Sequence, residues 1–269
     1  MTQSPDMQKT HQPIINLPWI VTALIFSFIA IHLWRGWFLT PAEDGLFQFE
    51  YALVPARLSI AYLTDGLQAV VAAIQESGDA DTYLQLSLVQ QIMGEGSVRL
   101  ETLLTHTFLH GSWLHLGFNA IWFAAFGAPL ARRWGTVWFI IFCILTALTG
   151  ALFHYLSQPY SVIPTIGASG VVSGMFGAAA WYVFDRNDSG YVSESVSYNR
   201  RLNLSELVHH RTALAFTGFW LVGNYFFAQF AGELVGEHST IAWQAHVGGF
   251  IGGFLFFPLL DDHIRKAES

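Results

Sequence analysis

The sequence predicts an all-α membrane protein with six transmembrane helices and a long external loop after the first helix. Of the 269 residues, 53% are hydrophobic and only 12% are charged, whereas soluble domains average about 25% charged residues. Uncharged apolar stretches recur along the chain, and several reach the length of about 20 residues that a helix needs to cross a bilayer. A single cysteine, Cys143, excludes an internal disulfide framework.

Six stretches are expected to cross the membrane, because they are long, apolar and carry no charged side chain. They are residues 17–34, 102–131, the two parts of 134–184, 212–232 and 240–260. The stretch 134–184 is too long for a single helix. Pro159 and Pro164 divide it within residues 157–165, because proline stops helices.

The distribution of lysine and arginine predicts the orientation of these spans, because short cytoplasmic loops carry an excess of both residues. Nine of the twelve fall on one side of the membrane: Lys9, Arg132, Arg133, Arg186, Arg200, Arg201, Arg211, Arg265 and Lys266. The other three fall on the opposite side: Arg35, Arg57 and Arg99. The sequence therefore predicts cytoplasmic tails at residues 1–16 and 261–269, flanking a membrane domain at residues 17–260.

The external loop at residues 36–105 carries nine acidic residues against two arginines. Within it, residues 58–75 form an apolar segment that could be a seventh span or a helix lying on the membrane surface. Asp65 stands in the middle of this segment, and a charge at the bilayer centre is costly. A seventh span would also invert every later loop, so we expect an interfacial helix.

Four polar residues fall at a similar depth in three of the expected spans. Counted at about 1.5 Å per residue from the nearest cytoplasmic charge, Ser169 lies about 24 Å and His246 about 22 Å above the inner boundary. His115 and Asn119 lie about 26 Å and 20 Å above it. Polar groups inside a membrane are functional candidates by default. The shared depth therefore predicts one polar site, built by three helices in the outer third of the membrane.

The residues of this site suit acyl transfer. A serine hydroxyl becomes an effective nucleophile when a histidine takes its proton, and Ser169 and His246 could form that pair. The reaction also needs donors for the developing oxyanion. His115 and Asn119 share a helix face at spacing i, i+4. The backbone N–H of Ser169 adds a third donor, because the first amides of a helix have no internal partner.

Glycines on the fourth and sixth spans would let the serine and the histidine meet. They are Gly170, Gly174 and Gly177 on the fourth span, and Gly248, Gly249, Gly252 and Gly253 on the sixth. Small residues at such spacing let two helix backbones approach closely in a membrane. We expect Gly170 and Gly249 to support the site in this way, because a serine side chain is too short to bridge widely spaced helices.

Three motifs in combination resemble the rhomboid intramembrane serine proteases. They are "HGSWLHLGFN" at residues 110–119, "GASG" at 167–170 and "AHVGGFIGG" at 245–253. The resemblance extends over residues 17–260 and implies a six-helix rhomboid-like bundle. It also implies that Ser169 is the nucleophile and His246 the base, and that His115 and Asn119 serve the oxyanion.

The same resemblance implies supporting roles and partners. Gly167 would belong to the loop on the oxyanion side, and His110 would support the outer loop. The substrates would be transmembrane proteins, cleaved near their outer ends within the lipid bilayer and without a cofactor. No basic cluster suggests a nucleic acid partner, and the absence of an organellar transit peptide favours a bacterial inner membrane.

Two positions depart from the family pattern. Ser173 stands where the family often has an aromatic residue that stacks on the base. The family's outer loop often carries a Trp-Arg pair, whereas here Trp34 and Arg35 end the first span. The missing Trp-Arg pair bears on how the outer loop contacts the membrane, and it does not bear on the catalytic chemistry.

Two other functions fit parts of the pattern. A non-catalytic relative could bind membrane clients, but such relatives are expected to lack the serine or the histidine, and this chain has both. A metal or haem protein could use His106 and His110, which are also spaced i, i+4. No carboxylate or cysteine joins these histidines at that depth, and ligation would not explain Ser169, so we expect no metal.

Overall fold

The computed structural model describes residues 17–78, 81–95, 98–184, 200–235 and 242–268. The predicted N-terminal tail at residues 1–16 therefore lies outside the described residues. Within the described ranges the fold is all-helical, and β pairing is limited to an isolated bridge between Leu53 and Thr165. The helices are α1 (Trp19–Phe38), α2 (Pro41–Tyr51), α3 (Pro55–Tyr62), α4 (Gly66–Ser77), α5 (Thr82–Glu95), α6 (Thr102–Thr105), η1 (His106–Phe108), α7 (Trp113–Ser157), α8 (Ser169–Ala179), α9 (Leu204–His209), α10 (Arg211–Val235) and α11 (Trp243–Glu268).

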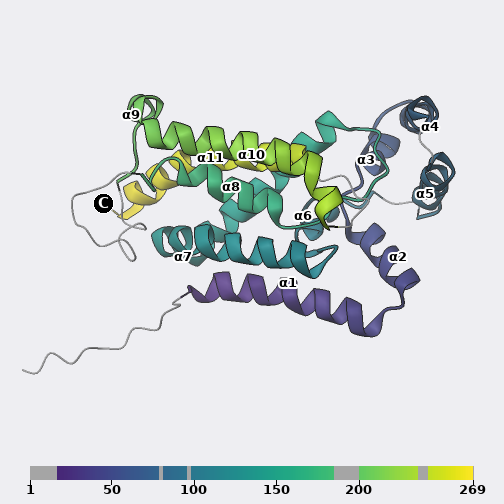
Figure 1. Cartoon of the computed structure of the whole chain (residues 1–269), viewed down its shortest axis with the longest axis horizontal. Coiled ribbons are helices and arrows are strands. Elements are labelled where there is room, and N and C mark those ends of the chain that lie inside the picture. Colours follow the sequence, from purple (N-terminus) through teal and green to yellow (C-terminus); the bar gives the residue numbers. More distant parts are fainter. Residues whose placement is uncertain (1–16, 79–80, 96–97, 185–199, 236–241, 269) are drawn as a thin grey trace, which may run out of the picture.

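The long helices lie side by side along the long axis of the molecule, and the short helices gather at its two ends (Figure 1). Helices α2 to α5 occupy one end, whereas α9 and the end of α11 lie at the other. The start of α1 lies at the same end as the close of α11. Helix α11 also runs on to Glu268, so the predicted C-terminal tail is helical over its described residues.

Helix α7 contains two of the expected spans, joined at Gly135. It has 45 residues, and a straight helix of that length would extend about 68 Å, twice the thickness of a bilayer core. Gly135 interrupts it with φ 73° and ψ 178°, a conformation that glycine adopts readily because it has no Cβ. The interruption leaves two arms of about 33 Å each. It falls where the sequence predicted a division, after Arg132 and Arg133.

The second expected span begins later than predicted. The chain from Thr102 forms only α6 and one 3₁₀ turn, and Leu109 is then extended, with φ −94° and ψ 142°. The long helix starts after Ser112, whose side-chain oxygen accepts a hydrogen bond from the His115 N–H (3.2 Å). Because Ser112 caps the new helix, the start of the span at residue 102 is corrected to Trp113.

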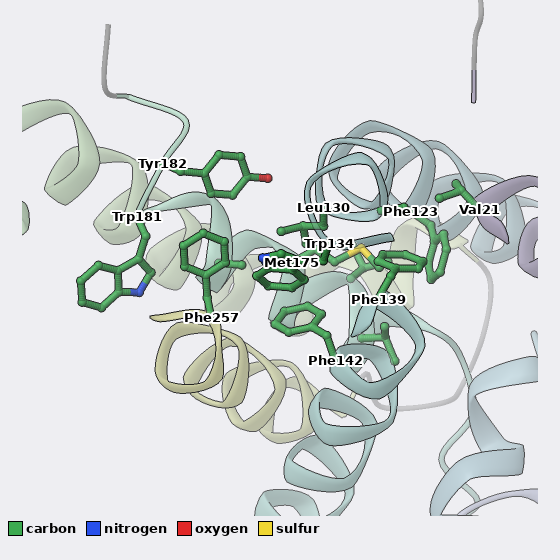
Figure 2. Packing of buried hydrophobic residues seen from close by; sticks show 14 of the residues in the cluster. Val21, Phe123, Leu130, Trp134, Phe139, Phe142, Met175, Trp181, Tyr182 and Phe257 are labelled. Carbon is green, nitrogen blue, oxygen red and sulfur yellow. The ribbon is translucent and has the colours of Figure 1, made fainter. Parts of the chain in front are cut away.

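The bundle is organised around α8, which packs against α7 and α11. Figure 2 shows its Met175 among Phe123, Phe139 and Phe142, with Phe257 of α11 nearby. All of the α8 residues after Gly170 except Phe176 are buried, and most are glycine, alanine or valine. Because these side chains are small, α7 and α11 pack closely against α8. This packing fixes the position of Ser169, the first residue of α8.

The outer surface of the long helices is apolar, as expected for contact with lipid. Trp19, Phe26, Val137, Phe219 and Leu255 are all more than half exposed. Such extensive apolar exposure is uncommon in soluble monomers. Within the part of the chain that the structure describes, three helices, α1, α7 and α11, are long and apolar enough to cross a membrane by length and composition.

The segment expected to form an external loop, residues 36–105, differs from its prediction. Residues 58–75 do not form one helix: α3 ends at Tyr62 and α4 begins at Gly66. Gly66 donates its N–H to the Leu63 carbonyl (3.1 Å), and a side chain on Gly66 would overlap the carbonyl of Ser59. The tight turn therefore breaks the apolar run, and the pieces of 8 and 12 residues are too short to cross a membrane.

Helices α2 to α5 enclose a small apolar core of their own. Its buried side chains are Phe49, Val54, Ala56, Val70, Ile74, Val89, Ile92 and Val162. The bridge between Leu53 and Thr165 joins this segment to the loop that precedes α8, with N···O distances of 3.0 and 2.8 Å. Helices α2 to α5 are thus joined by backbone hydrogen bonds to the loop that leads into Ser169.

A buried carboxylate joins α7 to α11 at the opposite end of the molecule. Asp261 is 2% exposed, and its oxygens accept hydrogen bonds from Arg133 (2.6 and 2.8 Å) and from the indole N–H of Trp134 (3.0 Å). Arg265 lies 3.1 Å from the same carboxylate. The cluster therefore fixes the kink region of α7 against the end of α11.

We predict that Asp261→Ala strongly destabilises the fold, because it leaves Arg133 buried without its carboxylate. Breaking a buried pair from one side typically costs about 3–5 kcal/mol. Asp262→Ala is the matched control, since Asp262 is half-exposed and pairs with Arg201 (2.6 Å), and an exposed pair contributes about 0–1 kcal/mol. Thermal unfolding in detergent measures both variants. Equal midpoints would contradict the role of the buried cluster.

Candidate active site

Ser169 and His246 lie within hydrogen-bond distance of each other. The distance from Ser169 Oγ to His246 Nε2 is 2.7 Å. Ser169 is the first residue of α8, and His246 lies in the first turn of α11. A histidine nitrogen at this distance can accept the hydroxyl proton, which is the geometry that nucleophilic catalysis by serine requires.

Close contact of α8 with α11 makes this short distance possible. A Cβ on Gly249 would overlap the carbonyl oxygen of Gly170, and a Cβ on Gly253 would overlap that of Gly174. The second arm of α7 is equally near, because a Cβ on Gly150 would lie 2.9 Å from the Ala245 carbonyl oxygen. The backbones themselves are therefore in contact, and no larger side chain fits between them.

Gly167 lies close to both His115 and Ser169. Gly167 has φ 117°, and its N–H donates to the His106 carbonyl (2.9 Å). A Cβ at this position would lie 2.7 Å from His115 Nε2 and 3.7 Å from Ser169 Oγ. The position therefore excludes a side chain on both conformational and steric grounds, and the His115 ring faces the loop that carries the serine.

Asn119, on the first arm of α7, and His110, in the turn before that arm, extend this arrangement. The Asn119 side chain is 5% exposed and donates from Nδ2 to the His115 carbonyl (3.0 Å), which leaves one amide proton for another acceptor. The ring of fully buried His110 lies edge-on to that of His115, with centroids 5.2 Å apart. It also packs against Phe28 of α1 (5.5 Å). These contacts link both Asn119 and His110 to His115.

Residues 98–261 match the family described as the Rhomboid domain, which is more than half of the chain. The chain belongs to the rhomboid family. All of the predicted site residues fall within the matched range, whereas α1 to α5 of this rhomboid lie before it. The match is therefore narrower than the resemblance over residues 17–260 that the motifs suggested.

Curated relatives of this rhomboid carry the name rhomboid protease GlpG. Those of Pectobacterium atrosepticum and Haemophilus influenzae are each 31% identical to the chain. The first alignment covers 56% of this chain and 45% of the relative, and the second covers 61% and 70%. The relative from Yersinia enterocolitica is 27% identical, with 64% and 57% covered. The chain thus spans about half the length of most of these relatives.

The structure adds one site neighbour that the sequence analysis missed. Asn224 of α10 lies with its Oδ1 2.7 Å from His246 Nδ1, on the far side of the ring from Ser169. A signal was present, because a polar residue inside an apolar span is a functional candidate by default. Asn224 also lies 13 residues after Arg211, at a depth of about 20 Å that matches the other site residues.

Arg35 is a second residue whose place the sequence did not indicate. It is 3% exposed at the end of α1, where it pairs with Asp44 of α2 (2.6 Å) and donates to the His110 carbonyl (3.0 Å). Arg35 thus joins α1, α2 and the turn that leads into α7.

Proposed function

We propose that this rhomboid is an intramembrane serine endopeptidase that cleaves transmembrane segments near their outer ends. The observation that carries the proposal is the 2.7 Å separation of Ser169 Oγ and His246 Nε2. The names of the GlpG relatives support it. The substrates are membrane proteins, the surrounding medium is the bilayer, and the reaction uses no cofactor.

The proposed mechanism is a two-step acyl transfer. His246 takes the proton of Ser169 as Oγ attacks the scissile carbonyl carbon, and then gives this proton to the leaving amine nitrogen. A water molecule, deprotonated by the same histidine, attacks the acyl-enzyme and restores the free serine. The negative charge on the former carbonyl oxygen is stabilised by His115, Asn119 and the backbone N–H of Ser169.

The proposed topology has six crossings, with both termini in the cytoplasm of a bacterium. The crossings are α1, the two arms of α7, α8 with the turns that follow it, α10 and α11. Helices α2 to α6 and η1 form the external segment. This arrangement is supported by the positions of the basic residues and by the gathering of α2 to α5 at one end (Figure 1). The membrane domain then extends over residues 17–260.

The alternative functions have less support. A protein that only binds clients would have no use for a serine and a histidine 2.7 Å apart. Among the described residues, no three side chains of His, Cys, Asp or Glu group as metal ligands. His106 also uses its Nδ1 on the Thr102 carbonyl (2.8 Å).

The test is cleavage of a defined substrate by the purified protein in liposomes. The substrate is a single transmembrane helix with a fluorophore at one end, and the fragment masses locate the cut. We expect one cut near the outer end of the helix. An intact substrate, under conditions in which the protein remains folded, would contradict the proposed activity.

We predict that Asn119→Ala slows cleavage by about 10²–10³, the usual cost of one oxyanion donor. His115→Ala should do more harm, because its ring also lies against Gly167. Serine labelling by a fluorophosphonate should persist in Asn119→Ala. Cleavage at the wild-type rate in both variants would remove the first arm of α7 from the oxyanion site.

A further inference from the structure

We propose that Asn224 is a positioning residue that holds His246 in the tautomer that the reaction needs. The inference deepens the proposed function and rests on it. Its basis is the contact between Asn224 Oδ1 and His246 Nδ1 at 2.7 Å. The two ring nitrogens of His246 are thereby engaged on opposite sides, by Asn224 of α10 and by Ser169 of α8.

The contact selects one tautomer of the imidazole. A neutral histidine carries one proton, so one ring nitrogen donates and the other accepts. An amide oxygen can only accept, so the nitrogen that faces it, Nδ1, must carry the proton. Nε2 is then left with its lone pair toward the Ser169 hydroxyl, as a general base requires. The other tautomer would set two acceptors against each other at Nδ1.

A second hydrogen bond fixes which end of the Asn224 amide faces the histidine. Its Nδ2 donates to the Trp243 carbonyl (3.4 Å). If the amide were turned over, its oxygen would face that carbonyl oxygen and its NH₂ would face the ring. The turned amide would lose the hydrogen bond to the Trp243 carbonyl and would place its own oxygen against that carbonyl oxygen. Oδ1 is therefore the atom that faces His246.

Aromatic contacts hold the Asn224 face of α10 against α11. The ring of Trp220, one turn before Asn224, stacks on Phe250 with centroids 4.5 Å apart. Tyr225 packs edge-on to Trp243 (6.1 Å). These contacts fix the rotation of α10 at this level, although α10 packs less extensively on α11 than α8 does.

The arrangement joins a third helix to the serine and the histidine. Without Asn224, the hydrogen bond to Ser169 would be the one that the ring retains among those of the described residues, so the ring could rotate or adopt the other tautomer. A misplacement of about 1 Å in a catalytic group can cost on the order of 10²-fold in rate. We therefore expect the loss of Asn224 to lower kcat by about 10- to 100-fold while KM changes little, since Asn224 lies behind the base.

Three substitutions separate this role from simple packing. Asn224→Ala removes the acceptor, and Asn224→Leu removes it while keeping the volume, so both should lose kcat. Asn224→Asp keeps an acceptor oxygen on a side chain of the same length and should recover most of it. Val222→Ala, at an exposed position on the same helix, is the matched control and should behave as wild type.

¹⁵N NMR of protein labelled with ¹⁵N-histidine determines the tautomer of His246, and it needs no substrate. The His246 signals are assigned by their loss in His246→Gln. We expect a protonated Nδ1 and an unprotonated Nε2 in wild type and in Asn224→Asp, and a mixed or reversed pattern in Asn224→Ala and Asn224→Leu. The wild-type tautomer in both of the latter variants, or an unchanged kcat, would overturn the proposal. Failure of the proposed function would instead appear as an inactive wild type that still shows the tautomer difference.

Discussion

Cleavage of a transmembrane substrate is expected to fall by at least about 10⁴-fold when Ser169 is replaced by alanine. The variant keeps the helix start and the glycine contacts but loses the atom that attacks the carbonyl. Removal of the serine in well-studied serine proteases costs on the order of 10⁶-fold in kcat. His246→Ala should fall nearly as far, because an unactivated hydroxyl is a poor nucleophile. Rates are measured in liposomes with the substrate in excess.

Two controls accompany these variants. Ser173→Ala makes the same change one turn further along α8, at a buried position, and should retain most of the activity. The double variant lacking both Ser169 and His246 should be no slower than Ser169→Ala alone, since residues that act as a unit are not additive. Wild-type turnover in Ser169→Ala or in His246→Ala would remove these two residues from the mechanism.

A loss of at least about 10²-fold is expected from Gly249→Val, although every proposed catalytic group remains. A Cβ on Gly249 would overlap the Gly170 carbonyl, and because the obstacle is backbone, α8 and α11 must move apart. Ser169 and His246 begin these two helices, so their 2.7 Å contact would be lost. A displacement of about 1 Å in a catalytic group can lower the rate on the order of 10²-fold. The overlap requires the two helices to separate by at least about that distance.

Gly218→Val separates this effect from a general effect of valine in a membrane helix. Gly218 lies on α10, where an added Cβ would meet no neighbouring atom within 4 Å, so the variant should be close to wild type. Thermal unfolding of both variants distinguishes lost geometry from lost fold. Full activity in Gly249→Val, or equal damage from Gly218→Val, would mean that the glycines do not set the distance between α8 and α11.

The long helices followed from the sequence because lipid imposes one strong rule, namely a stretch of uncharged apolar residues of sufficient length. The break at residues 157–165 and the division after Arg133 both agree with the structure. Local turns were harder to predict. The tight turn at Gly66 and the cap at Ser112 each interrupt an apolar run. Both rest on local hydrogen bonds, Gly66 to Leu63 and His115 to Ser112, which hydropathy does not report.

The meeting of Ser169 with His246 could be predicted from depth, because position along a membrane helix translates into height. Depth says nothing of rotation about the helix axis, so it could not show which polar residue of α10 turns toward the site. Asn224 was therefore missed. With Ser173 in place of an aromatic residue, the sequence left the orientation of the base unexplained, and the structure supplies Asn224 Oδ1 at 2.7 Å.

Arg35 shows a related limit of the sequence. A lone arginine at the outer end of a span is ordinarily taken as an interfacial residue. In the structure it is buried and joins Asp44 to the His110 carbonyl. Long-range pairing of this kind requires knowledge of how the external segment folds back on the bundle, which no pattern in residues 36–105 provides.

The most direct test of the central proposal is covalent labelling of the purified protein by a fluorophosphonate, followed by mass spectrometry of the modified peptide. The reagent reacts with a serine only when a base activates it. We expect Ser169 to carry the label in wild type and labelling to be lost in His246→Ala. A label on any other residue, or undiminished labelling of Ser169 without His246, would contradict the proposed serine–histidine mechanism.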